Sequence, residues 1–489
     1  MKRSPMFDTL KKIKKIKSSN ENKSKPKALF IFRRDLRVFD NITLLECAKK
    51  YKVCPIFIFT PEQIEQNEYK SSNAIQFMIK SLEDLKISIE DLGGQFYTFF
   101  GDNIEVISKI IKDDDIKGVF FNKDYSPYSQ KRDSAIEKLC KEVSIEFQSY
   151  HDIILIDDFD VIKSKEGKPY YVFTHFYNQA KKLSVKQPNY KTIDNWGSLN
   201  NNKFVIEDFK NYLLNRKCFV YNPSIALQGG RKEALTMLEK NLKKWAQYKE
   251  TRDRPEHENG TTKLSAHNKF GTVSIRELYY HFSGTYGDGC ELNRQLYWRD
   301  FYYYLSYWFP ETFEGKPLPS KLKYKDLQWN YNDDWLNKWK EGKTGFPIVD
   351  AGIRELITTG YMHNRSRMIV AMFLTKDLLL SWKEGEKFYS QYLIDIDWCQ
   401  NTGNWHWCDG TGADGSPWLR IFNPWTQQQK FDPNCEYIKK YVPELKNVPN
   451  KSIHKWFDEW KEYKKINYPC PMVNHDTRRK ETLKAYGEV

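Results

Sequence analysis

Short apolar runs alternate with longer amphipathic stretches over the first third of the chain. The apolar runs lie at residues 28–32, 53–59, 95–100, 118–121 and 145–147. Two of the stretches between them, 72–92 and 130–143, carry apolar residues at helical spacing. Buried strands that alternate with helices are typical of a parallel sheet with helices on both faces. We therefore expect a doubly wound α/β domain over residues 28–155, a shape that suits nucleotide binding but does not give a function.

The pattern changes after this region. Residues 156–225 are polar and rich in turn-forming residues, so they are predicted to connect two domains. Beyond them strand patterns are rare, and apolar positions at helical spacing dominate, as in 231–245 and 293–307. The rest of the chain, 226–489, is therefore predicted to form an all-α domain without internal repeats.

Composition supports a division into two domains. The chain has 489 residues, and all 15 tryptophans lie at or beyond Trp196. The net charge is +14, but residues 1–27 alone carry ten Lys and Arg against two acidic residues. Such a tail is typical of a solvated, disordered arm, and nuclear targeting or extra affinity for DNA are the alternatives.

The nine cysteines are scattered and include no Cys-x-x-Cys pair. A disulfide framework or a zinc site is therefore not expected, and no metal site is predicted. No apolar run approaches the roughly 20 residues that span a bilayer, and the basic N-terminus lacks a secretory apolar core. We expect a soluble, intracellular monomer that does not bind membranes.

Two motifs in the predicted helical domain suggest ligand contacts. Residues 248–255 and 260–265 place hydroxyls and backbone amides just before a helical segment, where they can cradle a phosphate. The alternative is a simple helix cap. Residues 296–301 place Trp298 beside Arg299 and Asp300 on an apolar helix, and the alternative there is a core Trp with a buried Arg–Asp ion pair.

The densest group of polar residues lies between Gly342 and Asp432. It includes the segments 345–352, 362–368, 395–397 and 401–407, which are rich in Asn, Arg, Asp and His. Buried helices do not accumulate such residues unless these pair with each other or with a ligand. The region is therefore predicted to bind something polar.

These segments carry a resemblance to a known family. The sequence resembles the photolyase and cryptochrome family, most closely its class I cyclobutane-dimer photolyases, in order from about residue 28 to 450. Residues 32–41 are similar to the family's N-terminal hallmark, and the loop 261–265, Trp298-Arg299 and 360–432 are similar to its flavin-binding signature. The resemblance implies that FAD is bound in a folded conformation among helices and that light drives the repair of pyrimidine dimers in DNA.

The resemblance also implies which residues bind FAD. The residues expected to bind the phosphates and sugar of FAD are Tyr248, Thr261, Thr262, Leu264 and Ser265. Arg299, Asn364, Arg367, Asp395 and Asp397 are expected to contact the cofactor or frame its isoalloxazine ring, with an ion pair between Arg367 and Asp395. Fixed positive charge and hydrogen-bond donors suit a reduced, anionic flavin.

Asn401 matches the position that faces the flavin N5, where plant and animal cryptochromes carry Asp or Cys. An amide there favours a photolyase over a signalling cryptochrome. Trp329, Trp382 and Trp405 match the tryptophan relay that carries electrons from the surface to photo-oxidised flavin. The alternative is three packed core tryptophans.

Substrate choice follows from the same resemblance. The 6-4 photolyases use two histidines, and the matching positions here are Asn364 and Met368, so a cyclobutane dimer is the expected lesion. Met368, Trp298 and Trp407 match the side of the pocket that faces the dimer, and Gln295 stands where many relatives have Glu. Arg252 and Arg365 are expected to contact phosphates of the damaged DNA without reading its sequence, and Arg420 is a third candidate.

The resemblance leaves alternatives in both function and cofactor content. A cryptochrome-type photoreceptor is one alternative. A photolyase specific for single-stranded DNA is another, because Asn404 replaces a second Gly before Trp405, as in the single-strand-preferring cryptochromes. Tyr361 replaces the usual Trp before Met-His-Asn-Arg. A second, light-harvesting chromophore of the folate or deazaflavin type is possible, since residues 121–128 match a family turn but no binding signature for either.

Overall fold

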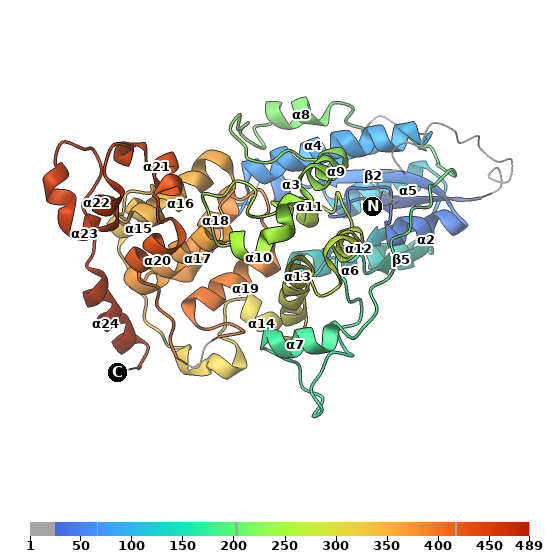
Figure 1. The fold of residues 1–489 in the computed structure, drawn as a ribbon. Helices are drawn as coiled ribbons and strands as arrows, with labels where there is room; N and C mark the ends of the chain where they lie inside the picture. Colours follow the sequence, from blue (N-terminus) through green and yellow to red (C-terminus); the bar gives the residue numbers. More distant parts are fainter. Residues whose placement is uncertain (1–24, 66, 201–203, 416–417, 489) are drawn as a thin grey trace.

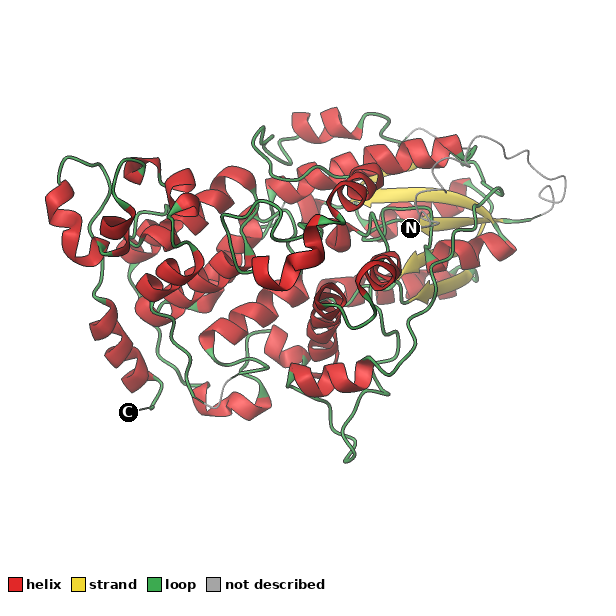
Figure 2. Ribbon diagram, viewed as in Figure 1, coloured by secondary structure: helices red, strands yellow, loops and turns green. Residues whose placement is uncertain are grey.

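The computed structural model describes residues 25–65, 67–200, 204–415 and 418–488. The molecule is elongated, with all strands of the described chain gathered at one end and helices filling the rest (Figures 1 and 2). Residues 1–24, most of the basic segment predicted to be a disordered arm, lie outside the described residues.

The strands form a single five-stranded parallel sheet in the order β3-β2-β1-β4-β5. The strands are β1 (Lys27–Ile31), β2 (Lys52–Phe59), β3 (Tyr97–Phe100), β4 (Ile116–Asn122) and β5 (Glu146–Tyr150). Each predicted apolar run falls within or beside one of them. Such runs are continuous because a parallel sheet is covered on both faces.

Helices cover both faces of this sheet. They are α2 (Ile42–Lys50), α3 (Pro61–Ile64), α4 (Ser72–Asp91), α5 (Asn103–Asp113) and α6 (Pro127–Glu142). Phe30 of β1 packs in one core with residues of α2 and α4, whereas its neighbour Ile31 packs in another core with residues of α5 and α6. The predicted doubly wound α/β fold is confirmed.

The segment between the sheet and the large helical region contains two short helices, α7 (Phe173–Ala180) and α8 (Phe209–Asn215). It lies against the sheet, where the backbone N–H of Gly197 donates to the carbonyl of Val53 and that of Ile206 donates to Thr98. Although its composition is polar, this predicted connector packs on the sheet and is not a free linker.

The remainder of the described chain is helical, as predicted. Its helices are α9 (Arg231–Asn241), α10 (Tyr248–Thr251), α11 (Ser265–Phe270), α12 (Ile275–Tyr286), α13 (Glu291–Trp308), α14 (Pro310–Phe313), α15 (Asp333–Lys340), α16 (Pro347–Thr359), α17 (Asn364–Met372), α18 (Trp382–Tyr392), α19 (Trp398–Asp409), α20 (Pro424–Phe431), α21 (Glu436–Tyr441), α22 (Asn450–His454), α23 (Trp456–Glu459) and α24 (His475–Ala485). No helix within the described ranges is both long and apolar enough to cross a membrane.

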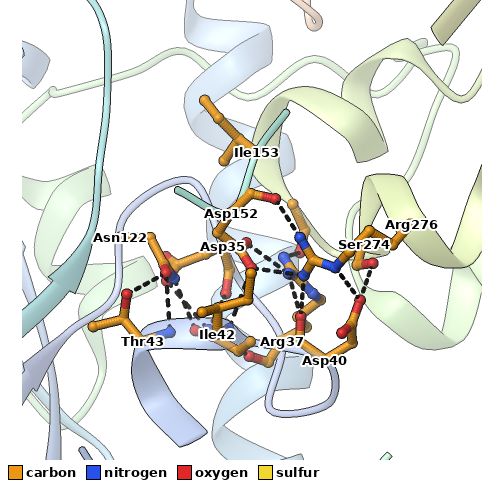
Figure 3. Close-up of polar contacts among 12 residues, drawn as sticks. Asp35, Arg37, Asp40, Ile42, Thr43, Asn122, Asp152, Ile153, Ser274 and Arg276 are labelled. Carbon is orange, nitrogen blue, oxygen red and sulfur yellow. Dashed lines mark hydrogen bonds and ion pairs between the residues drawn. The ribbon is translucent and has the colours of Figure 1, made fainter. Parts of the chain in front are cut away.

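A buried network of charged groups joins the α/β part to the helical part (Figure 3). Arg276 of α12 donates to the carboxylates of Asp40, at 2.9 Å, and Asp152, at 2.8 Å. Arg37 donates to the second oxygen of Asp152 at 2.6 Å. The four side chains are at most 3% exposed. Since a buried charge without a partner is costly, the network fixes how the two parts meet.

Candidate functional site

A cavity of about 530 Å³ lies among α10, α11, α13, α17 and α19. All ten residues predicted to bind the cofactor line it: Tyr248, Thr261, Thr262, Leu264, Ser265, Arg299, Asn364, Arg367, Asp395 and Asp397. So do all six residues predicted to face the lesion or the DNA: Gln295, Trp298, Met368, Trp407, Arg365 and Arg252. The fold thus collects residues that are up to 159 positions apart, from Tyr248 to Trp407, around one space.

The ion pair expected between Arg367 and Asp395 is present. The Nη2 atom of Arg367 donates to both oxygens of Asp395, at 3.1 and 2.9 Å, while its Nε donates to the carbonyl of Met362 at 2.8 Å. Burial alone would lower the pKa of Arg367, but the Asp395 carboxylate outweighs it and raises that pKa. Arg367 therefore stays cationic at the cavity wall.

Asp397 connects the cavity to the α/β part of the molecule. Its carboxylate accepts hydrogen bonds from Arg34 and from the hydroxyl of Tyr303, the latter at 2.5 Å, and it caps the start of α19 by accepting from Gln400 N–H. Burial opposes ionisation, yet Arg34 and then Lys269 and Arg299 lower the pKa of Asp397. Arg34 thus supplies a cation from a distant part of the sequence.

Arg299 does not form the buried ion pair with Asp300 that was the alternative for this motif. Within the described residues it donates to the carbonyls of Ile153 and Asn268 and lines the cavity. Asp300 accepts from the backbone N–H groups of Leu155 and Ile156 at 2.7 and 3.1 Å. Both side chains therefore bond to the backbone of residues 153–156 and not to each other.

The loop before α11 is not a simple side-chain cap. Leu264 occupies the N-cap position and its side chain cannot accept a hydrogen bond, so the first amides of this helix lack a side-chain partner. Thr262 Oγ1 accepts from the Leu264 N–H at 3.3 Å, and Thr251 Oγ1 donates to the Gly260 carbonyl at 3.2 Å. The loop presents hydroxyls and amides to the cavity, as a phosphate contact requires.

A smaller pocket of about 90 Å³ shares seven lining residues with the main cavity and adds Asn401 and Trp405. The Nδ2 atom of Asn401 donates to the Glu386 carbonyl and to Ser390 Oγ, both at 3.1 Å. Because both amide protons are used, Oδ1 is the polar atom of Asn401 left for a ligand. It can accept a hydrogen bond there.

Trp329 and Trp382 do not line the cavity. Trp405 is 2% exposed and lies against Gly385 of α18, one helical turn after Trp382, which is 6% exposed. The strand-like segment at Asn330 pairs with Leu380, so the half-buried Trp329 lies close to the start of α18. The three tryptophans therefore follow one another from the pocket outward, with exposure rising along the series.

The residues expected to face the lesion have protein partners of their own. Trp298 stacks on Phe173 of α7, with ring centroids 3.6 Å apart and an 8° angle between planes. Gln295 Nε2 donates at 3.0 Å to Glu291, which also pairs with Arg252, and Arg365 pairs with Asp253 at 2.8 Å. Acidic partners thus offset part of the charge of both arginines.

Several cavity residues were not singled out in the sequence. Lys269 and Asn268 of α11 line the cavity, as do Tyr302, Gln400 and Asp414. Burial, and after it the neighbouring Arg34, lowers the pKa of Lys269 to about 8. Lys269 lies four residues after the predicted phosphate loop, and extending that loop by one helical turn would have included it. Phe173, in the polar connector, carried no comparable signal.

Models of known families match both parts of the chain. The model described as DNA photolyase matches residues 28–191, and that described as the FAD binding domain of DNA photolyase matches residues 292–488. The deoxyribodipyrimidine photo-lyase of Alkalihalophilus pseudofirmus is 34% identical over 92% of this chain and 96% of that protein. The enzyme of the same name from Escherichia coli is 32% identical over 93% of this chain and 97% of its own length.

Solved structures agree with this assignment. A photolyase from Sulfolobus tokodaii, described with two FAD molecules, is 37% identical, with a TM-score of 0.81 over 95% of this chain and all of that one. That structure is described as implying a novel light-harvesting cofactor. A cryptochrome from Synechocystis is 26% identical, with a TM-score of 0.84 over 95% of this chain. The chain therefore belongs to the photolyase and cryptochrome family and is an FAD-binding photo-lyase.

Proposed function

We propose that this protein uses light to repair cyclobutane pyrimidine dimers in DNA. The observation that carries the proposal is the shared cavity, in which the residues expected to bind FAD and those expected to face a dimer line the same space. An enzyme that transfers an electron between a cofactor and a lesion needs both within one water-poor site, because positioning lowers the barrier.

The residues of the cavity fit FAD. Arg299, Lys269 and Arg367 offer cationic groups to an anionic dinucleotide. The Oδ1 atom of Asn268 is buried and accepts no hydrogen bond from the described protein, so a donor on a ligand would satisfy it. Bound there in its reduced state, FAD supplies an electron for the lesion when it absorbs light.

The role of the protein at the lesion is to hold the flipped-out dimer. Trp298 has one face stacked on Phe173, which leaves the other face for a base. Glu291 accepts from the amide nitrogen of Gln295, so the Oε1 atom of Gln295 is the one that can accept a hydrogen bond from a pyrimidine edge. Since Asn364 and Met368 lack the acid–base capacity of histidine, a 6-4 photoproduct is the less suitable lesion.

The tryptophan series supplies electrons when the cofactor is oxidised. Trp405 borders the smaller pocket, and its ring centroid lies 4.9 Å from that of Tyr389. Trp382 is the next tryptophan outward. Dense aromatic packing alone would explain the two buried rings of Trp405 and Trp382. The increase in exposure from Trp405 to Trp329 is what supports a relay that ends near the surface.

The test is the repair of an oligonucleotide that contains one thymine dimer, under blue light, with the cofactor chemically reduced beforehand. The lead proposal expects repair of the double-stranded form. Repair confined to the single-stranded form would identify a single-strand-specific photolyase, which Asn404 on the cavity wall would favour. Absence of repair of either form would contradict the proposal and leave a cryptochrome-type photoreceptor as the alternative.

A further inference from the structure

A second group of aromatic residues leads away from the cavity, on elements other than α18 and α19, which carry Trp382 and Trp405. It consists of Tyr303 on α13, Tyr125 in the turn after β4, and His151 directly after β5. The ring centroids of Tyr303 and Tyr125 are 5.3 Å apart. The Tyr125 hydroxyl lies 2.6 Å from His151 Nδ1. Tyr303 and Tyr125 are buried, and His151 is half-buried.

Tyr303 lies directly behind the wall of the cavity. Its hydroxyl donates to Asp397 at 2.5 Å and accepts from Arg34 at 2.6 Å, and Arg299 lies 4.9 Å from its ring centroid. Asp397 and Arg299 both line the cavity. A single layer of side chains therefore separates this tyrosine from the space that the cofactor would occupy.

The two tyrosines differ in how well they can lose an electron. A tyrosine releases an electron readily only if its hydroxyl proton has an acceptor within hydrogen-bond reach. Tyr303 is unfavourable, because Arg34 already donates to its hydroxyl and because the guanidinium groups of Arg34 and Arg299 beside it repel a positive charge. Tyr125 has an imidazole as its partner and no guanidinium on its hydroxyl.

His151 is suited to take that proton. Burial, and after it Lys123, lowers the pKa of His151 to about 4, so the ring is neutral at pH 7 and Nδ1 can accept. The charged groups that face this pair come from several elements: Lys123, Lys186, Asp157 and Asp158 around His151, and Asp300, Asp124 and Asp152 around Tyr125. The carboxylates near Tyr125 favour a positive charge on the pair.

We propose that Tyr125, paired with His151, is a one-electron donor toward the cofactor, separate from the tryptophan series. The oxidant is photo-excited, oxidised FAD, so the inference rests on the proposed function. The O–H bond of Tyr125 breaks, its proton passes to His151 Nδ1, and its electron crosses the Tyr303 ring to the cofactor. When the electron returns, the proton returns from the imidazolium to the tyrosyl oxygen.

The experiment uses the FAD-loaded protein with Trp382→Phe, which interrupts the tryptophan series. The oxidised protein is illuminated with blue light, frozen, and examined by electron paramagnetic resonance after growth on ring-deuterated tyrosine. We expect a tyrosyl signal that narrows with deuteration. It should be lost when Tyr125→Phe is added and should persist when Tyr304→Phe is added. Tyr304, next to Tyr303 in the sequence, is also buried, and its hydroxyl donates to the Ile162 carbonyl, which cannot take a proton.

A second variant keeps the inference testable if Tyr125→Phe does not fold. His151→Leu keeps the Tyr125 ring but removes the proton acceptor, so it should also abolish the signal. Absence of a tyrosyl signal in Trp382→Phe, or its persistence with either Tyr125→Phe or His151→Leu, would overturn the inference. Dimer repair by the wild-type protein with chemically reduced cofactor is measured separately. Failure of dimer repair would count against the proposed function, whereas the electron paramagnetic resonance experiment would still test the role of Tyr125.

Discussion

Lys269 is a cationic residue of the cavity for which the described structure shows no carboxylate within ion-pair distance. Burial and Arg34 lower its pKa to about 8, so the ammonium form prevails below that pH and the neutral amine above it. A dinucleotide phosphate nearby would raise the pKa again, since it favours the charged form. The strength of cofactor binding is thus tied to the protonation of one side chain.

We predict that FAD binds more weakly as the pH rises through and above about 8, because Lys269 then loses its positive charge. Lys269→Met should weaken binding at pH 7 by about tenfold, equivalent to about 1.4 kcal/mol, and should flatten the pH profile. Fluorescence titration of FAD from pH 7 to about 9.5 measures both. Lys316→Met, which removes an exposed charge, is the control. Parallel profiles for wild type and Lys269→Met would contradict the prediction.

Arg367 offers a second prediction. Arg367→Met leaves the Asp395 carboxylate, which is 5% exposed, without its cation and should destabilise the protein by about 3 kcal/mol and reduce the FAD content. Arg367→Met combined with Asp395→Asn should recover part of the lost stability, because no orphan charge remains, but should not recover the FAD content. Thermal unfolding and the flavin absorbance per chain measure the two effects. Equal melting temperatures of the single and double variants would refute the explanation.

Helices α18 and α19 approach each other closely at Gly385. A methyl group there would lie 2.1 Å from the Trp405 ring. The closeness sets the position of Trp405, which packs beside the helix that begins with Trp382. Glycine is required at this point for the room it leaves, and its backbone angles are those of an ordinary helix.

We predict that Gly385→Ala displaces Trp405, lowers stability by about 1–3 kcal/mol and slows photoreduction of oxidised flavin. Trp382→Phe should slow photoreduction too, but without a comparable loss of stability. Gly284→Ala in α12 is the matched control, because nothing lies within 4 Å of the added methyl group and alanine favours a helix. Melting curves and flavin absorbance under steady blue light provide the readouts. Unchanged photoreduction in Gly385→Ala would remove Trp405 from the relay.

At the same scale, the sequence predicts elements better than their contacts. The five strands and the long helices α4, α6 and α13 follow from apolar spacing, since burial on one or two faces leaves a periodic trace. The eight-residue helix α7 leaves almost none, yet its Phe173 stacks on Trp298. Arg34 and Asp397 are separated by 363 positions, and no local pattern could pair them. The family resemblance located the cavity residues and the Arg367–Asp395 pair, whereas the acidic partners of Arg252 and Arg365 emerged only in three dimensions.

On the scale of the whole molecule, the two parts are joined by buried charges as well as by a shared apolar core, in which Phe77 stacks on Phe270. Arg276 reaches from α12 to two carboxylates that belong to the α/β part, and Arg37 completes the group (Figure 3). Such groups contribute little net stability compared with apolar packing, but they disfavour any other docking, since each misplaced charge would be buried alone.

Arg276→Met should therefore cost about 3–5 kcal/mol and should uncouple the two parts during unfolding. Fourteen of the fifteen tryptophans lie at or beyond Trp245, so their fluorescence follows the helical part, whereas circular dichroism follows both parts. The two urea-unfolding curves should coincide for the wild type and separate for the variant. Arg354→Met, which breaks a partly exposed pair with Glu444, should cost no more than about 1 kcal/mol without separating the curves. Coincident curves for Arg276→Met would count against coupling through this network.

The contact between Arg34 and Asp397 has a thermodynamic consequence for cofactor loading. If docking of the α/β part strengthens FAD binding through this contact, FAD must strengthen docking by the same factor, because coupling between two equilibria is reciprocal. A substitution at the boundary between the two parts would then present as a flavin-poor preparation. Conversely, added FAD would rescue such a variant from partial unfolding, with a gain that grows with the logarithm of FAD concentration.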